Sequence, residues 1–426
     1  MSTGGRVVVT AVCVAVFLGS WSLLHHVWYQ DPEIGDTPVY ESYARQIVHD
    51  RMPYGDFSVE YPPGFLLPAL APEATAQPND PYSYAHDFER WMAGAGVVLV
   101  VLAAAALAAL RARPVRFAAA LGFVAVSPLL LGTVMLSRFD LWVAALAIGG
   151  LGAMLAGRDR LGGVLVAAAI ATKLWPAVFV PLGLVWVWRR RGRHAALRWL
   201  ALVLGVCAAF FAPFAVLAPR GLVHSFGLQL GRPLQIESLG SALLLAAHNV
   251  GGLPVSVVTS YGSQNLLAPG ATAMATVTSV IEILAVCGVW LAFARGPARA
   301  ERLAAAAAAV VAVLIAFGKV FSPQYLIWLI PLVPLVRSRL ASLLLGVALV
   351  STQFYFPTEY AYLRRLEQGP AWVVLARDLI VVMLAVELVR TLLAREPSTD
   401  DVRERSAGRQ LERPPGTAEP VPATSI

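Results

Sequence analysis

Two lysines interrupt long apolar stretches of this chain, and they are the only lysines among its 426 residues. Lys173 lies in Ala-Thr-Lys-Leu-Trp-Pro, and Lys319 lies in Gly-Lys-Val-Phe-Ser-Pro-Gln-Tyr. Placing an ammonium group beside hydrocarbon costs roughly 2.5 to 3.5 kcal/mol on insertion scales, so such residues usually line a polar cavity or pair with an anion. Both lysines are therefore candidates for a functional site.

A carboxylate stands at the predicted start of a helix soon after the first apolar stretch. Thr37 followed by Pro38 is typical of a helix beginning, with Thr as the N-cap and Pro at the first helical position. Apolar and aromatic side chains then recur at helical spacing as far as Ile47, which predicts a short amphipathic helix in a membrane interface. Asp36 would precede its N-terminus, where the helix dipole favours an ionised carboxylate. An ionised carboxylate in this position can act as a base.

Aromatic rings and further carboxylates alternate in the segment that follows. Between Met52 and Gly64, prolines and glycines force turns and extended backbone. Asp56, Glu60 and Tyr61 lie in this stretch. Rings that stack on apolar faces, next to carboxylates that accept hydrogen bonds from hydroxyl groups, are suited to a polyhydroxylated ligand.

A second polar stretch, Arg-Pro-Leu-Gln-Ile-Glu-Ser, begins at Arg232 and contains Gln235 and Glu237. The planar fork of an arginine can clamp a phosphate group. Three further cations could contribute to phosphate binding, namely Lys173, Lys319 and Arg138. A phosphate or pyrophosphate leaving group needs such charge neutralisation as its bond breaks.

The composition defines the setting of these residues. Apolar residues make up 58% of the chain and charged residues 14%, whereas soluble domains are about 45 to 50% apolar. A helix needs about 17 to 25 apolar residues to cross the hydrocarbon core. We expect such spans at 6–28, 91–110, 116–135, 140–156, 196–218, 272–294 and 371–394, with short or broken ones at 161–172, 174–188, 303–318, 324–336 and 340–356. The sequence therefore predicts an all-α, polytopic transmembrane helical bundle of about twelve spans.

Arginines mark one side of the predicted bundle. Cytoplasmic loops are enriched in Lys and Arg, and with a cytoplasmic N-terminus every predicted inner loop is basic, at 111–116, 158–160, 189–193, 295–302 and 337–339. This agreement requires two crossings between 161 and 188, divided at Lys173. The long outer loop 29–88 carries ten carboxylates against two arginines, a formal charge of −8. The net charge of +7 thus combines two oppositely charged faces and does not indicate nucleic-acid binding.

With this topology, the unusual polar residues fall at the outer ends of the spans. They are Arg138, Asp140, Lys173, Lys319, Gln324 and Tyr325. Two long outer loops, 29–88 and 219–271, lie on the same side and carry short interfacial helices. The sequence therefore predicts a single extracytoplasmic site roofed by the two loops.

One transmembrane domain, residues 1–395, accounts for all of these features. Residues 396–426 are rich in Pro, Arg, Glu, Ser and Thr, which is typical of a disordered tail, here cytoplasmic. The three cysteines fall in apolar spans and the histidines of the outer loops are isolated, so we expect no metal centre. Because no Gly-rich strand-to-helix fingerprint is present, a nucleotide ligand is disfavoured and no cofactor is indicated.

Seven short motifs in order resemble a known family. They are Asp-x-x-x-Tyr at 36–40, Pro-Tyr at 53–54, Tyr-Pro-Pro at 61–63, Ser-Arg-Phe-Asp at 137–140, Lys-x-x-Pro at 173–176, Arg-Pro-x-Gln-x-Glu-Ser at 232–238 and Lys-x-x-Ser-Pro-Gln-Tyr at 319–325. Together they look like the bacterial integral-membrane glycosyltransferases of the GT-C class. The chain is most similar to family 87, which includes actinobacterial polyprenol-phosphate-mannose-dependent α-mannosyltransferases. The resemblance covers most of residues 1–390.

The resemblance implies transfer of a sugar, with mannose as the expected one, from a polyprenyl-phosphate donor to an extracytoplasmic glycolipid or glycan acceptor. The anomeric carbon would be inverted, and Asp36 would be the general base by its position in the motif. The protein would be a multi-pass plasma-membrane enzyme whose two termini are cytoplasmic. We expect the donor phosphate to be bound by Arg232, Lys319, Lys173 and Arg138, and the sugar or acceptor by Tyr40, Asp56, Glu60, Tyr61, Asp140, Gln235, Glu237, Gln324 and Tyr325.

Other interpretations compete with this one. A transporter or flippase of lipid-linked envelope precursors would also have about a dozen spans, but with charges near the bilayer midplane. A non-catalytic partner in envelope assembly is a third possibility. At the level of single residues, Asp36 could be only a helix-start carboxylate, and the lysines could extend to the interface. Asp140 could pair with Arg138, and Arg232 could pair with the nearby Glu237.

Overall fold

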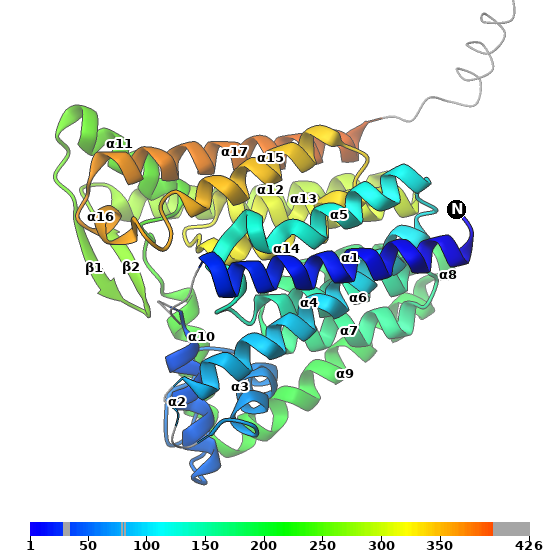
Figure 1. Ribbon diagram of the computed structural model, residues 1–426, viewed down its shortest axis with the longest axis horizontal. Coiled ribbons are helices and arrows are strands. Elements are labelled where there is room, and N and C mark those ends of the chain that lie inside the picture. The colour runs from blue at the N-terminus through cyan, green and yellow to red at the C-terminus, as the bar shows by residue number, and fades with distance from the viewer. Residues whose placement is uncertain (29–34, 78–79, 81, 395–426) are drawn as a thin grey trace, which may run out of the picture. The chain divides into compact units, whose positions relative to one another are not determined.

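The chain divides into two units, Met1–Leu392 and Leu393–Ile426. The structure, a computed structural model, describes residues 1–28, 35–77, 80 and 82–394. The first unit holds the helical bundle shown in Figure 1. The tail predicted at 396–426 and the part of the first outer loop at 29–34 lie outside the described residues.

The predicted spans fold as helices, with one exception. The helices are α1 (Thr3–Leu23), α4 (Ser83–Ala109), α5 (Pro114–Leu131), α6 (Asp140–Leu155), α7 (Asp159–Thr172), α8 (Phe179–Arg191), α9 (Arg193–Leu217), α12 (Ala271–Arg295), α13 (Ala300–Phe317), α15 (Arg339–Gln353) and α17 (Gln368–Leu393). Segment 324–336 is broken into turns around the short helix α14 (Leu326–Leu329), because Pro331 and Pro334 cannot continue a helix. The all-α polytopic bundle is confirmed.

Six of the described helices are long and apolar enough to cross a membrane. The shorter apolar helices, such as α6 and α15, are also candidates for crossing when packed among longer ones. The total of about twelve spans therefore stays a prediction. The predicted break at Lys173 does separate two helices, α7 and α8.

Packing distinguishes the interior of the bundle from its lipid-facing surface. Helix α13 has an alanine-rich stretch, 304–309, that is fully buried, and its small side chains allow close approach of α8 and α12. Helix α9 instead exposes large apolar side chains, among them Leu204 and Val216. Such a surface is unfavourable in water but is the normal exterior of a helix in lipid.

The glycines of α6 serve helix packing. A Cβ added to Gly150 would lie 3.1 Å from the carbonyl oxygen of Gly162, and one added to Gly162 would lie 2.9 Å from that of Gly150. Helices α6 and α7 therefore cross with their backbones close together. This geometry explains the Gly-Gly-Leu-Gly sequence at 149–152 without a nucleotide.

Contacts join the arginine-rich loops to other parts of the bundle. Arg189 donates to the carbonyl of Gly296, and Arg116 donates to the carbonyl of Leu335. The Arg189 contact connects two predicted inner loops, and the Arg116 contact connects a third to the end of the predicted span 324–336. In Figure 1 the N-terminus lies at one end of the long helices, whereas α2, α10 and the β-hairpin lie at the other.

The first outer loop folds over the opposite end of the bundle. It contains α2 (Thr37–Val48) and α3 (Leu66–Glu73). The N-cap is Asp36 rather than the predicted Thr37, so the helix begins one residue earlier than expected. Tyr40 and Tyr43 are buried, because α2 packs against α3 and α4.

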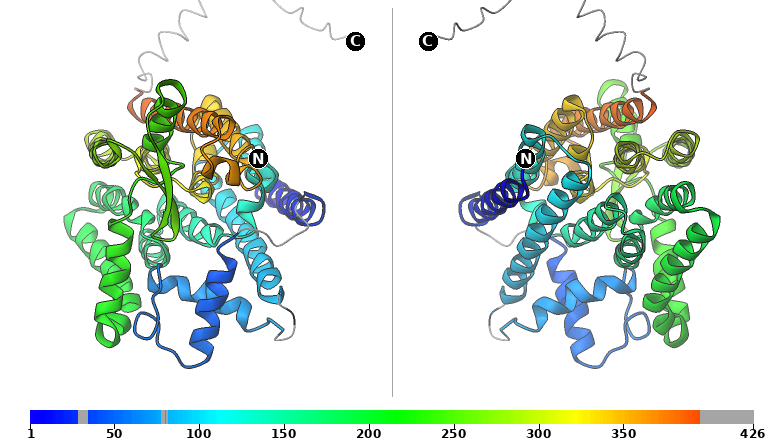
Figure 2. Two further views of the ribbon diagram at one scale, coloured as in Figure 1. Left: turned by 90° about the vertical axis from the view of Figure 1, so that its left-hand side faces the viewer. Right: turned by 90° about the vertical axis from the view of Figure 1, so that its right-hand side faces the viewer.

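The second outer loop contains two helices, as predicted, and a β-hairpin that was not predicted from the sequence. After α10 (Pro219–Leu230) and α11 (Leu239–Gly251), β1 (Ser256–Ser260) pairs with β2 (Ser263–Leu267) in an antiparallel ladder with Ser260 opposite Ser263. The turn residues Tyr261 and Gly262 have φ of 54° and 66°, as a two-residue hairpin turn requires. The end-on view in Figure 2 (left) shows the hairpin in front of the helix ends.

Two interruptions in the helices face these loops. Between α7 and α8, Lys173 has extended backbone and is followed by a 3-10 turn, Trp175–Val178. After α13, a second 3-10 turn, Pro323–Tyr325, precedes α14. Irregular backbone at membrane depth is tolerated where it lines a cavity, and residues from both breaks line the same cavity.

We predict that Gly64→Ala weakens the docking of the first outer loop. A Cβ at this position would lie 2.7 Å from the carbonyl oxygen of Ala171 and 2.9 Å from the amide nitrogen of Thr172, so the loop must move away from the end of α7. Forced overpacking typically costs about 1–3 kcal/mol, and we expect a lower Tm in detergent. Gly94→Ala is the matched control, because no atom lies within 4 Å of its added Cβ. Equal Tm for the two variants would contradict this packing.

Candidate functional site

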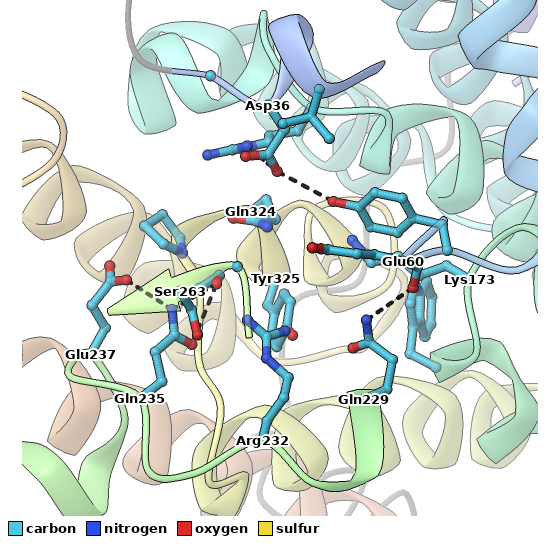
Figure 3. Close-up of a pocket in the computed structure, with 18 of the residues that line it drawn as sticks. Asp36, Glu60, Lys173, Gln229, Arg232, Gln235, Glu237, Ser263, Gln324 and Tyr325 are labelled. Carbon is cyan, nitrogen blue, oxygen red and sulfur yellow. Dashed lines mark hydrogen bonds and ion pairs between the residues drawn. The ribbon is translucent and has the colours of Figure 1, made fainter. Parts of the chain in front are cut away.

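A polar cavity of about 400 Å³ lies between the two outer loops and the helix interruptions. Ten of the predicted site residues line it: Asp36, Glu60, Tyr61, Arg138, Lys173, Arg232, Gln235, Glu237, Gln324 and Tyr325. The tip of the hairpin, 262–264, closes part of its wall. In Figure 3, Asp36 and Arg232 come from opposite sides of the cavity. Segments that are far apart in the sequence thus form one site.

Asp36 holds an ion pair with Arg138 at the wall of the cavity. The pair joins the N-cap of α2 to the connection that precedes α6. Two phenols donate to the same carboxylate oxygen, Oδ2, at 3.3 Å from Tyr40 and 3.4 Å from Tyr61. The side chain of Asp36 is 34% exposed and that of Arg138 is 10% exposed. The carboxylate therefore reaches the cavity, while its arginine partner is mostly enclosed.

The ion pair keeps Asp36 ionised. Burial by itself would raise the pKa of Asp36, but the charge and hydrogen bond of Arg138 outweigh it and hold the pKa below its usual range. Lys173 and Tyr40 act in the same direction. The helix dipole was expected to favour the ionised carboxylate, whereas in the structure the guanidinium of Arg138 is the main cause of the lowered pKa.

Lys173 has a different partner, Asp140. Its Nζ lies 2.7 Å from Oδ1 of Asp140, and Nε1 of Trp328 donates to the same oxygen at 2.6 Å. Asp140 is fully buried and does not line the cavity. The alternative pairing of Asp140 with Arg138 is therefore wrong, and Asp140 supports Lys173 from behind the wall.

Arg232 is the cavity's cation without a carboxylate partner. Among the described residues, no acidic oxygen lies within ion-pair distance of its guanidinium, so the predicted alternative pairing with Glu237 is not formed. Its charge acts on the neighbouring Glu60, whose pKa is raised by burial and only partly lowered again by Arg232. The side chain points from its loop into the cavity (Figure 3). An uncompensated guanidinium in a partly enclosed cavity is suited to an anion.

Glu237 is held by a hydrogen-bond network. Tyr355 donates to Oε1 at 3.1 Å, while Tyr360 and Gln235 donate to Oε2 at 3.4 and 3.1 Å. Burial raises the pKa of Glu237 to about 7, although the nearby Arg377 opposes this effect. Gln235 also donates to Ser322 at 2.9 Å. The network fixes the polar stretch that begins at Arg232 against the interruption that follows α13.

Aromatic rings form another part of the wall. Trp175 stacks on Trp328 with a centroid distance of 4.8 Å, and Trp328 stacks on Tyr325 at 4.2 Å. The ammonium of Lys173 lies 4.7 Å from the ring centroid of Phe139. These rings pack around the lysine and present an apolar surface next to its charge.

Four predicted contact residues do not line the cavity. Tyr40 is buried and reaches it only through its hydrogen bond to Asp36. Asp56 accepts a hydrogen bond from the backbone nitrogen of Met52 at 2.7 Å and stabilises a turn. Nζ of Lys319 donates to the carbonyl of Leu230 at 2.8 Å. The fourth is Asp140, the buried partner of Lys173.

Arg377 supports the site from α17 and was not predicted from the sequence as a site residue. Arg377 is fully buried, lies 2.7 Å from Asp378, and donates to the backbone carbonyl of Glu237 at 2.8 Å. Its guanidinium carbon lies 3.8 Å from the ring centroid of Phe321. The sequence signal was the adjacent Arg-Asp pair at 377–378, because ionisable residues within an apolar helix are rare and commonly pair with one another or mark a functional site.

The described part of the chain holds no cluster of metal ligands. No group of three or more His, Cys, Asp or Glu side chains there is arranged to hold an ion. Asp36, Lys173 and Glu237 are instead engaged by partners from the protein itself.

The fold and the cavity together define a polytopic membrane protein with a polar site at one end of its helical bundle. The model of glycosyltransferase family 87 matches residues 60–323, which is more than half of the chain. The chain therefore belongs to glycosyltransferase family 87. No curated protein matches it in sequence. The matched region includes Arg138, Lys173 and Arg232, but Asp36 precedes it.

We predict that Asp140→Asn destabilises the protein. The substitution leaves the largely enclosed Lys173 without its anion, and breaking one side of a buried pair typically costs about 3–5 kcal/mol. Thermal unfolding in detergent should show a clearly lowered Tm. The double variant Asp140→Leu with Lys173→Met removes both charges and should recover much of the loss. A single variant as stable as wild type would show that the pair is unimportant for the fold.

Proposed function

We propose that this family 87 enzyme transfers a sugar from a polyprenyl-phosphate donor to an extracytoplasmic acceptor, with Asp36 as the general base. The observation that carries the proposal is the position of two opposite charges on opposite walls of the cavity. An ionised carboxylate at one wall faces a guanidinium without a partner at the other. These are the two groups that an inverting transfer from a phosphate leaving group needs.

Charge balance favours a phosphodiester donor. Arg138 is compensated by Asp36, and Lys173 is compensated by Asp140. Arg232 remains as the uncompensated cation among the described residues of the cavity. A sugar joined to a prenyl chain through one phosphate carries a single negative charge, whereas a diphosphate or nucleotide sugar carries more. One guanidinium without an ion-pair partner matches the phosphodiester, and burial raises the pKa of the two other carboxyl groups that line the cavity, Glu60 and Glu237.

The polar residues around the two charges would bind the sugar and the acceptor. Glu60, Gln235 and Glu237 provide acceptors and donors for hydroxyl groups, and all three line the cavity. Tyr325 and the stacked tryptophans offer an apolar face for a sugar ring or the first isoprene unit. Gln324 lies between the two walls in Figure 3. Mannose is the proposed sugar because the sequence motifs resemble mannose-transferring members of the family.

The proposed reaction is a single displacement. The acceptor hydroxyl gives its proton to Asp36, its oxygen bonds to the anomeric carbon, and the bond from that carbon to the phosphate oxygen breaks. The electron pair of the broken bond leaves with the phosphate, where Arg232 stabilises the added charge. Because attack and departure occur on opposite faces, the anomeric configuration is inverted.

The sidedness of the site is also part of the proposal. The acidic first outer loop and the cavity lie at one end of the helices. The arginine-rich loops make separate contacts, from Arg116 to Leu335 and from Arg189 to Gly296. The positive-inside tendency then assigns the arginine-rich loops and both termini to the cytoplasm. The cavity would open outside the plasma membrane, where a glycolipid or glycan acceptor can reach it.

We predict that Asp36→Asn abolishes transfer in protein that still folds, although the loss of the ion pair with Arg138 lowers its Tm. Asparagine keeps the shape of the side chain but cannot accept the proton, and general base catalysis is typically worth about 10²- to 10⁴-fold in rate. Product formation is measured with purified protein in nanodiscs. Asp50→Asn makes the same chemical change at an exposed residue of the same loop and should be near wild type.

Activity of Asp36→Asn near that of wild type would remove Asp36 from the mechanism. If no variant, including wild type, consumed any polyprenyl-phosphate sugar while still binding it, the proposed donor would be wrong. Transport or assembly of lipid-linked precursors would then become the better account.

We predict that Arg232→Gln weakens donor binding. Loss of the guanidinium removes the charge that matches the donor phosphate, so the KM for the donor should rise at least about tenfold, which corresponds to about 1.4 kcal/mol. Arg232→Lys should recover part of this loss because it keeps the charge but not the fork. An unchanged donor KM in Arg232→Gln would exclude Arg232 as the phosphate anchor.

A further inference from the structure

Three donors converge on one oxygen of Asp36. Arg138, Tyr40 and Tyr61 all contact Oδ2. The other oxygen, Oδ1, has no hydrogen-bond partner among the described residues. Although Asp36 is the N-cap of α2, its side chain accepts no hydrogen bond from the amides of the helix. The two oxygens of this carboxylate are therefore not equivalent.

The contact between Asp36 and Arg138 depends on a close backbone approach. A Cβ added to Gly35 would lie 2.5 Å from the Cβ of Ser137. This approach brings together the residues that follow each of them, Asp36 and Arg138. Arg138 is nearly enclosed, and its Nε has no hydrogen-bond partner in the described part of the chain. Its charge is thus held at the carboxylate and shielded from water.

We propose that Arg138 is a positioning residue for the base: it holds Oδ2 of Asp36, with the two phenols, so that Oδ1 receives the acceptor proton. This inference rests on the proposed function and assigns Arg138 to the base in the resting enzyme, where the sequence analysis assigned it to the donor phosphate. A carboxylate fixed through one oxygen presents the other in a defined direction, which favours a near-attack geometry.

Arg138 also has a second role during the reaction. As the acceptor proton moves to Oδ1, Asp36 becomes neutral, and the electron pair of the breaking carbon–oxygen bond makes the phosphate a dianion. The negative charge of the site thus passes from Asp36 to the leaving group. The charge of Arg138 is then uncompensated at the wall of the same cavity and stabilises the product.

Several ionisable groups face Asp36, and a test must separate them. They are Tyr40 and Tyr43 from α2, Glu60 and Tyr61 from the first outer loop, Arg138 before α6, and Lys173 after α7. Arg138 and Lys173 favour the ionised carboxylate, while the negative charge of Glu60 would oppose it. Of these groups, Arg138 carries a full charge in direct contact with Oδ2.

The experiment compares pH profiles of kcat/KM for wild type, Arg138→Gln, Arg138→Lys and Tyr61→Phe. Asp36 must be ionised to act, so activity falls as the pH drops through its pKa. Removing Arg138 raises that pKa, and the acid limb of Arg138→Gln should move to higher pH, with kcat lowered by about 10²-fold. Arg138→Lys should lie closer to wild type. Tyr61→Phe should shift the limb in the same direction, but less.

Arg232→Gln is the matched comparison. It removes a guanidinium from the same cavity but should leave the acid limb in place, because Arg232 makes no contact with Asp36 in the described structure. Should Arg138→Gln fail to fold, Arg138→Lys decides through kcat, which should fall because lysine keeps the charge but not the guanidinium that contacts Oδ2, while Tyr61→Phe tests the second contact with the same oxygen.

The inference is overturned if Asp36→Asn is inactive while the acid limb stays unmoved in Tyr61→Phe and in every folded Arg138 variant. That result would leave the general base in place and remove only the role of Arg138. Full activity of Asp36→Asn would instead overturn the proposed base itself. The two failures are therefore distinguishable.

Discussion

Charge pairing in a water-poor bundle is the constraint on which this site depends. A cation or carboxylate enclosed among helices is costly unless a partner of opposite charge lies beside it. Arg138 is paired with Asp36, Lys173 with Asp140, and Arg377 with Asp378. Each pair joins or stiffens a segment at the cavity. Among the described residues that line the cavity, Arg232 has the guanidinium without an ion-pair partner, and an anionic substrate would complete the balance.

The backbone provides the positions that these pairs need. The helices are broken at Lys173 and after α13, and the irregular backbone at both breaks lets polar groups line the cavity. Gly35 and Gly64 let the first outer loop approach Ser137 and the end of α7 closely. The hairpin tip at Gly262 then approaches Glu60 from the second loop. Rigid helices thus carry a site whose chemistry lies on irregular backbone.

Much of this arrangement was predictable from the sequence, for physical reasons. Hydropathy and arginine placement identify the helices, including the division at Lys173, because the bilayer imposes length and charge rules on each segment. Pairing partners were not predictable, because Asp140 meets Lys173 only through helix packing. The hairpin was missed although Tyr261 and Gly262 lie in a β-branched polar stretch, since two short strands in a loop give a weak pattern. Arg377 was visible as a charge, but its contact with the Glu237 carbonyl was not.

The most direct test of the account is a comparison of two donors with the same sugar and prenyl chain, one joined by a phosphate and the other by a diphosphate. Purified protein in nanodiscs is given each donor with a membrane-extract acceptor, and the released lipid and the anomeric configuration of the product are measured. The account predicts transfer from the phosphate-linked donor, release of polyprenyl phosphate and an inverted configuration. Transfer from the diphosphate-linked donor alone, or a retained configuration, would contradict it.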